Sequence, residues 1–172
     1  MKEFYFDFVK VFEAHVLPVP TGHVQFIAFY LMGRYKPGPA LTTHFLEFLW
    51  KKFQSPNTPS VIRQSTMSYI ASLTSRALYV SVPVLFSCLE KISGWIHGYI
   101  NNSAGSGPSL ASHGPFYSAC QALFYIFVFR RAHRLPAEPG SILQLFFALH
   151  KVYCVRYWSL ILSGTVACQL IA

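Results

Sequence analysis

The stretch from residue 45 to residue 77, FLEFLWKKFQSPNTPSVIRQSTMSYIASLTSRA, constrains the fold more than any other part of the chain. Proline lacks a backbone N–H, so Pro56 and Pro59 divide the stretch into two helical segments. The second helix is predicted to begin at Ser60, with Thr58 as its N-cap. In the first helix, large apolar residues recur at steps of three and four, which places them on one face: Phe45, Leu46, Leu49, Trp50 and Phe53. The stretch therefore predicts a helical hairpin.

The second helix of this hairpin has an apolar face of its own. The residues predicted to be buried along it are Ile62, Tyr69, Ile70, Leu73 and Ala77. The polar residues between them are expected to face water: Arg63, Gln64, Ser68 and Ser75.

Helical periodicity also marks most of the remaining chain up to residue 131. Amphipathic helices are predicted over residues 3–17 and 82–99, and a helix that is apolar nearly all round over 23–32, closed by Gly33 and the Pro37–Pro39 turn. A small, polar segment at 101–112 is predicted to be a loop. A further helix is expected to start at 113–115 and to end at a basic cluster. The predicted fold class is all-α.

Two helices carry similar motifs at similar distances along the chain. Leu46-Glu47 and Leu89-Glu90 are 43 residues apart, and Trp50 and Trp95 are 45 residues apart. A period of about 40–47 residues is typical of HEAT-like arrays of antiparallel helical hairpins. A plain helical bundle would produce similar stripes and is the alternative.

Composition indicates that something covers part of this chain. Hydrophobic residues make up 53% of the 172 residues and charged residues only 12%, more apolar surface than one small domain needs. A membrane, a partner subunit or the rest of a longer protein could cover the excess.

Residues 136–172 differ from the preceding part. We expect HEAT-like helical repeats over 1–135 and an apolar tail of doubtful structure over 136–172. Its last 16 residues, 157–172, carry no charge, but a membrane helix needs about 20. The run is thus short for a membrane span. A small helical protein with a C-terminal membrane-associating segment is kept as the alternative interpretation.

The formal net charge of +8 suggests an acidic partner: nucleic acid, anionic lipid or acidic protein. However, basic residues cluster only at Lys51-Lys52 and in the group Arg130, Arg131 and Arg134. Solvated helix faces and cations that compensate a helix C-terminus are the favoured explanation of these clusters.

The four cysteines are too widely spaced for a metal site, and the N-terminus lacks the pattern of a signal peptide. Reduced core cysteines and a reducing, intracellular compartment are expected. No cofactor, metal or small-molecule substrate is predicted.

Few residues support catalysis. His113 and Cys120 could meet as base and nucleophile, but no orienting group or oxyanion site accompanies them. Glu47 and Glu90 are more simply solvated helix residues than an acid pair. The chain is therefore predicted not to be an enzyme.

Helical arrays normally bind other macromolecules. The residues predicted to bind a partner are Lys51, Lys52, Arg63 and Gln64, although an ordinary polar ridge explains them too. Nearby serines are candidate sites of phosphorylation, because phosphate would change the local charge strongly: Ser55, Ser60 and Ser65.

Three stretches resemble a known family: HVQFIAFYLM at 23–32, residues 45–77, and HGPFYSACQALFYIFVFR at 113–130. The family is the RNA polymerase I-specific transcription initiation factors, also called transcription initiation factor IA, and the resemblance runs from about residue 4 to about 131. It implies a non-enzymatic HEAT-repeat scaffold in the nucleus and nucleolus. Such a scaffold would bind RNA polymerase I subunits and bridge them to the promoter selectivity factor, with only indirect contact to DNA. Family members are switched by phosphorylation of surface serines.

The resemblance also implies a partial chain, because the family proteins are several times longer. A truncated array would leave an apolar face uncovered, so Phe116, Leu123 and Phe127 are expected to be exposed.

Overall fold

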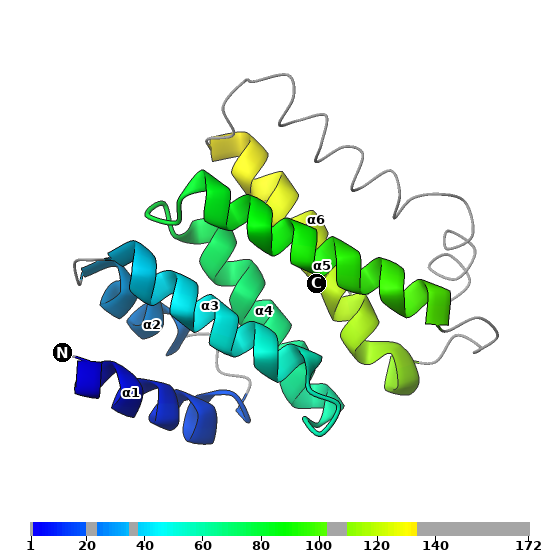
Figure 1. The fold of residues 1–172 in the computed structure, drawn as a ribbon, viewed down its shortest axis with the longest axis horizontal. Coiled ribbons are helices and arrows are strands. Elements are labelled where there is room, and N and C mark those ends of the chain that lie inside the picture. The colour runs from blue at the N-terminus through cyan, green and yellow to red at the C-terminus, as the bar shows by residue number, and fades with distance from the viewer. Residues whose placement is uncertain (1, 20–23, 35–37, 103–109, 134–172) are drawn as a thin grey trace.

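The computed structural model describes residues 2–19, 24–34, 38–102 and 110–133, and every regular element among them is helical (Figure 1). The all-α prediction is therefore confirmed for this part of the chain. A short π-helix, η1, directly continues α1. The elements are α1 (Lys2–Val11), η1 (Phe12–Val16), α2 (Val24–Arg34), α3 (Gly38–Gln54), α4 (Ser60–Arg76), α5 (Val82–Asn102) and α6 (Leu110–His133).

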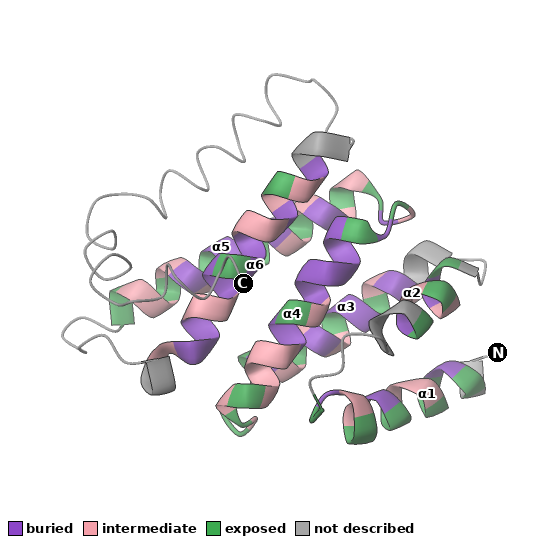
Figure 2. Cartoon of the chain, turned by 180° about the vertical axis from the view of Figure 1, so that it is seen from behind, coloured by how far each residue is buried: buried purple, intermediate pink, exposed green. Residues whose placement is uncertain are grey.

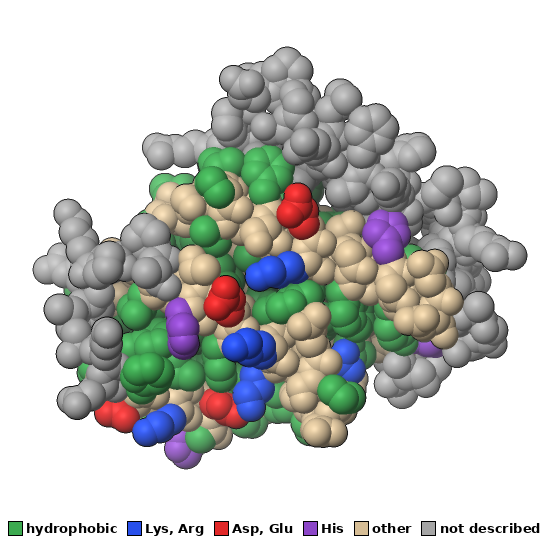
Figure 3. All heavy atoms as spheres, viewed as in Figure 1, with side chains coloured by type: hydrophobic (Ala, Val, Ile, Leu, Met, Phe, Trp, Pro, Cys, Tyr) green, Lys and Arg blue, Asp and Glu red, His purple; other side chains and the backbone are tan. Residues whose placement is uncertain are grey.

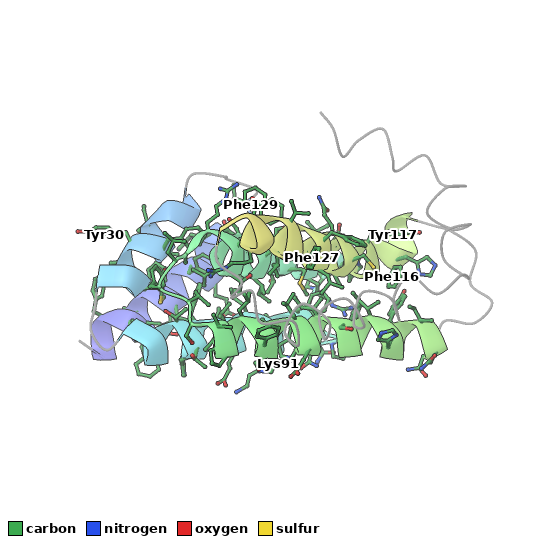
Figure 4. All side chains as sticks on the ribbon, turned by 90° about the horizontal axis from the view of Figure 1, so that it is seen from above. Tyr30, Lys91, Phe116, Tyr117, Phe127 and Phe129 are labelled. Atoms are coloured by element: carbon green, nitrogen blue, oxygen red, sulfur yellow. The ribbon has the colours of Figure 1, made fainter. Side chains whose placement is uncertain are left out.

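The helices form two layers. α3 and α5 lie side by side in one layer and α4 and α6 in the other, while α1 and α2 lie beside the α3–α4 hairpin (Figures 1 and 4). The predicted hairpin at 45–77 is therefore present as α3 and α4. The longer solenoid remains a prediction.

The centre of the fold is α4, which packs against α2, α3 and α6. Every residue from Thr66 to Ser75 is buried except Ser68 and Tyr69 (Figure 2). Most of the buried ones are Ser, Thr or Ala, and such short side chains let neighbouring helices approach closely. The expectation that Ser75 faces water was wrong, whereas Ser68 is exposed as predicted.

The two buried threonine hydroxyls of this helix are satisfied within it, whereas the buried Ser75 hydroxyl has no hydrogen-bond partner among the described residues. Thr66 Oγ1 donates to the Ile62 carbonyl at 2.7 Å, and Thr74 Oγ1 donates to the Ile70 carbonyl at 2.6 Å. A buried hydroxyl without such a bond would cost roughly 1–3 kcal/mol. These bonds therefore allow a polar sequence to occupy the core.

Aromatic side chains join the outer helices to this centre. The Phe12 ring meets Phe45 at 5.2 Å and Tyr69 at 4.9 Å between ring centroids, both edge to face. The Phe53 and Trp95 rings, 4.7 Å apart, link α3 to α5 in the same way. Each such pair adds about 0.5–1.5 kcal/mol beyond the burial of its surface.

Arg130 of α6 caps the C-terminus of α4. Its Nε donates to the Thr74 carbonyl at 2.6 Å and one terminal nitrogen donates to the Ala77 carbonyl at 2.8 Å. Helix C-terminal carbonyls lack intrahelical donors and carry partial negative charge, so a cation there is favourable. Burial lowers the pKa of Arg130, and its guanidinium donates two hydrogen bonds to backbone oxygens.

Several predicted helix ends were wrong. α3 begins at Gly38, earlier than predicted. Pro39 is tolerated in its first turn, because the backbone N–H groups of that turn have no intrahelical acceptor to lose. α4 begins at Ser60 as predicted, but its N-cap is Pro59 and no side chain caps it, so Thr58 has no capping role. α6 begins at Leu110, with Pro115 inside the helix.

The expected exposure along α6 is also corrected. Phe116 and Leu123 are buried, and Phe127 is half-buried. Phe116 stacks on Tyr99 of α5 with ring centroids 5.1 Å apart, which accounts for its cover.

Within the described residues, no helix has both the length and the apolar character that crossing a membrane requires. The predicted tail at 136–172 lies outside the described residues, so the proposed boundary at residue 135 remains a prediction.

Replacing Arg130 by Met should lower the free energy of unfolding by about 2–3 kcal/mol, because two buried carbonyls lose their donors. Urea denaturation of the full chain, followed by far-UV circular dichroism, measures the change. Arg76→Met is the matched control, since Arg76 is exposed and, among the described residues, contacts only the hydroxyl and ring of Tyr125; its effect should stay within about 0.5 kcal/mol. Equal effects of the two substitutions would contradict the capping role.

Candidate protein-binding surface

Lys51 and Lys52 lie in the last turn of α3. Lys51 is exposed, whereas Lys52 is half-buried and forms an ion pair with Glu13 of η1. Lys52 therefore holds the N-terminal helix against α3. Lys51 is the one of the two whose charge faces solvent.

Arg63 has an internal role that the sequence pattern did not reveal. Its Nε donates to the Phe53 carbonyl at 2.6 Å, and its guanidinium lies 5.4 Å from the Phe53 ring centroid and 5.8 Å from that of Trp95. Burial lowers the pKa of Arg63. The expectation that Arg63 faces water was therefore wrong: it caps the C-terminal turn of α3 and closes the hairpin.

Gln64 is also half-buried, contrary to expectation. Its Nε2 donates to Ser60 Oγ at 3.2 Å. A methyl group placed on Gly114 would come within 2.5 Å of the same nitrogen, so Gln64 packs directly against the backbone of α6. The four predicted residues do not form one exposed ridge.

The three candidate phosphorylation sites are half-buried and occupy different electrostatic environments. Ser55 follows the C-terminus of α3, where its backbone N–H donates to the Lys51 carbonyl at 3.1 Å. Ser60 is the first residue of α4, and Ser65 lies within that helix. The helix dipole therefore opposes a negative charge at Ser55 and favours one at Ser60.

The solvent face of α3 and α5 carries both signs of charge. Basic and acidic side chains alternate across it, as Figure 3 shows. Glu47 and Lys51 on α3 and Glu90 and Lys91 on α5 are all exposed. This face is therefore not the uniformly basic surface that binding to a nucleic-acid backbone requires.

The geometry does not support the pairing of His113 with Cys120. His113 Nδ1 and the Tyr99 hydroxyl are hydrogen-bonded at 2.7 Å. Burial raises the pKa of the Cys120 thiol to about 12. A catalytic cysteine needs a lowered pKa, because the thiolate is the nucleophile.

Three long-range contacts around this surface were missed from the sequence: Arg130 with the end of α4, Lys52 with Glu13, and Arg63 with Trp95. Arg130 had been assigned to a cluster that compensates a helix C-terminus, but the helix concerned is α4, more than 50 residues earlier. No local pattern carries such information.

Comparison with known proteins gives a consistent result. Residues 1–144 match the family model described as RNA polymerase I specific transcription initiation factor RRN3. The chain is 40% identical over 147 residues to the mouse RNA polymerase I-specific transcription initiation factor RRN3, covering 83% of this chain and 22% of that protein. It is 34% identical over 138 residues to tif-1A of Caenorhabditis elegans, covering 75% and 21%, and 27% identical over 128 residues to rrn3 of Schizosaccharomyces pombe, covering 73% and 21%.

No solved structure matches the chain. The chain spans about a fifth of the length of the curated relatives it matches. The family model nevertheless covers most of this chain, and it extends past the region in which the resemblance was recognised. The chain belongs to the family of RNA polymerase I-specific transcription initiation factors.

Proposed function

We propose that this chain is a non-enzymatic, protein-binding helical module that contacts RNA polymerase I during initiation of ribosomal RNA gene transcription. The observation that carries this proposal is the family match over residues 1–144. The mixed charge on the face of α3 and α5 supports a protein partner rather than direct contact with DNA. The high pKa of the Cys120 thiol argues against this cysteine as a catalytic nucleophile.

The end of the α3–α4 hairpin is the proposed polymerase contact. Lys51 would contact an acidic group directly, since it is exposed. Lys52, Arg63 and Gln64 would support that contact by fixing the hairpin, through Glu13, the Phe53 carbonyl and Ser60 respectively.

The proposed location of the chain and its proposed bridging role rest on the same family membership. We propose that the chain acts in the nucleus and nucleolus, and that in the context of the longer family proteins this region helps to bridge the polymerase to the promoter selectivity factor. Immunoprecipitation of the tagged chain from nuclear extract tests the bridging role. Recovery of polymerase I without the selectivity factor would limit the role to polymerase binding.

Lys51→Glu should weaken binding of the full chain to purified RNA polymerase I by about three- to tenfold, because an exposed interface charge steers and registers a partner. Biolayer interferometry at low and high salt measures the change, which should shrink as salt rises. Lys10→Glu is the matched control, since Lys10 is exposed on α1 and its one ion pair within the described part of the chain is with Asp7. Equal binding by the two variants would refute the contact at Lys51.

Phosphate on the hairpin serines should regulate the same contact. Ser55→Asp should destabilise the chain by about 0.3–1 kcal/mol and Ser60→Asp should not, because the two residues lie at opposite helix ends. Both, together with Ser65→Asp, should weaken polymerase binding by adding negative charge to the hairpin that carries Lys51. Unchanged affinity in all three variants would rule out this regulation.

A further inference from the structure

A groove separates α3 from α5 on the face that carries the mixed charges. Its walls are two helical stripes at spacings of three and four residues, and α4 forms part of its floor. The cavity volume is about 80 Å³. The α3 wall includes Leu46 and Glu47, the α5 wall includes Ser87, Lys91 and Ile92, and Ile70 of α4 lies at the floor.

The groove is apolar below and charged at its mouth. Leu46, Ile70 and Ile92 are buried beneath it. Glu47 on the α3 side and Lys91 on the α5 side are exposed, and neither forms an ion pair among the described residues. Figure 4 shows Lys91 extending from α5 on the side away from α6. Opposite charges, Glu47 and Lys91, therefore lie on the two walls of one apolar groove.

We propose that this groove binds a short segment of an RNA polymerase I subunit that inserts one aliphatic side chain between α3 and α5. The segment carries a basic residue that meets Glu47 and an acidic residue that meets Lys91. An aliphatic anchor in a fully desolvated pocket, flanked by complementary charges, is a recurrent arrangement at protein interfaces. This inference rests on the proposed function, because it takes the polymerase as the partner.

Size and charge together select a protein segment over other ligands. Pockets for drug-sized molecules and cofactors measure about 300–1,000 Å³, so this groove accepts only one side chain of moderate size. Nucleic acid and anionic lipid carry one sign of charge, and Glu47 and Glu90 would repel them. A polypeptide can present both signs on either side of an apolar residue.

The test compares Ser87→Trp with Gln121→Trp in the full chain. Ser87 is exposed at the mouth of the groove, so an indole there fills it without removing a core side chain. Gln121 is exposed on α6, in the other layer, and controls for the introduced tryptophan. Affinity for purified RNA polymerase I is measured by biolayer interferometry, after circular dichroism has shown that both variants fold.

Ser87→Trp should weaken binding at least tenfold and Gln121→Trp by less than twofold. Equal binding by the two variants, weakened or not, would overturn the groove and leave the proposed function standing. Failure of the unmodified chain to bind would overturn both, since the groove's occupant would then be absent from the polymerase.

If Ser87→Trp does not fold, two charge reversals test binding at the groove independently. Glu47→Lys and Lys91→Glu change exposed residues only, and each should weaken binding about threefold. Unchanged affinity in both variants would overturn the proposal.

Discussion

Burial of a polar helix is the constraint on which the rest of this structure depends. α4 contains Ser, Thr and Ala where a core helix usually has Leu and Ile, and it is nonetheless enclosed from Thr66 to Ser75 on most sides. Most of the cost of this arrangement is offset where hydroxyl groups return hydrogen bonds to their own helix, as Thr66 and Thr74 do, although the buried Ser75 hydroxyl has no partner among the described residues. The arrangement also requires that the C-terminal carbonyls find donors elsewhere, which Arg130 supplies from α6.

The same physical device occurs at the end of α3. There Arg63 donates to the Phe53 carbonyl from the following helix and covers two aromatic rings. Some of the basic side chains, such as Arg63, therefore make their contacts within the fold, and Lys52 is neutralised by Glu13. The surface that remains over α3 and α5 is of mixed sign, which explains why a net charge of +8 does not by itself indicate nucleic-acid binding.

Apolar periodicity predicted the elements well and their packing poorly. The all-α class, the start of α4 at Ser60 and the long amphipathic α5 follow from apolar spacing and proline positions. Ser75 and Arg63 were misplaced. Ser75 is buried although its hydroxyl has no hydrogen-bond partner among the described residues, and Arg63 is half-buried because the Phe53 carbonyl and the rings of Phe53 and Trp95 contact its guanidinium. Those partners are distant in sequence, so the groove between α3 and α5 could not be predicted either. The family resemblance came from specific sequence motifs in the chain and did not depend on how the helices pack.

Hydrogen–deuterium exchange of the full chain tests most directly whether α4 is the centre of the fold. Amides buried in a cooperative core exchange only on global unfolding, whereas those of peripheral helices exchange through local opening. The backbone amides of residues 66–75 should be the slowest in the described part of the chain, and those of α1, which exposes Phe4 and Phe6, among the fastest. Exchange in α4 as fast as in α1 would contradict the account.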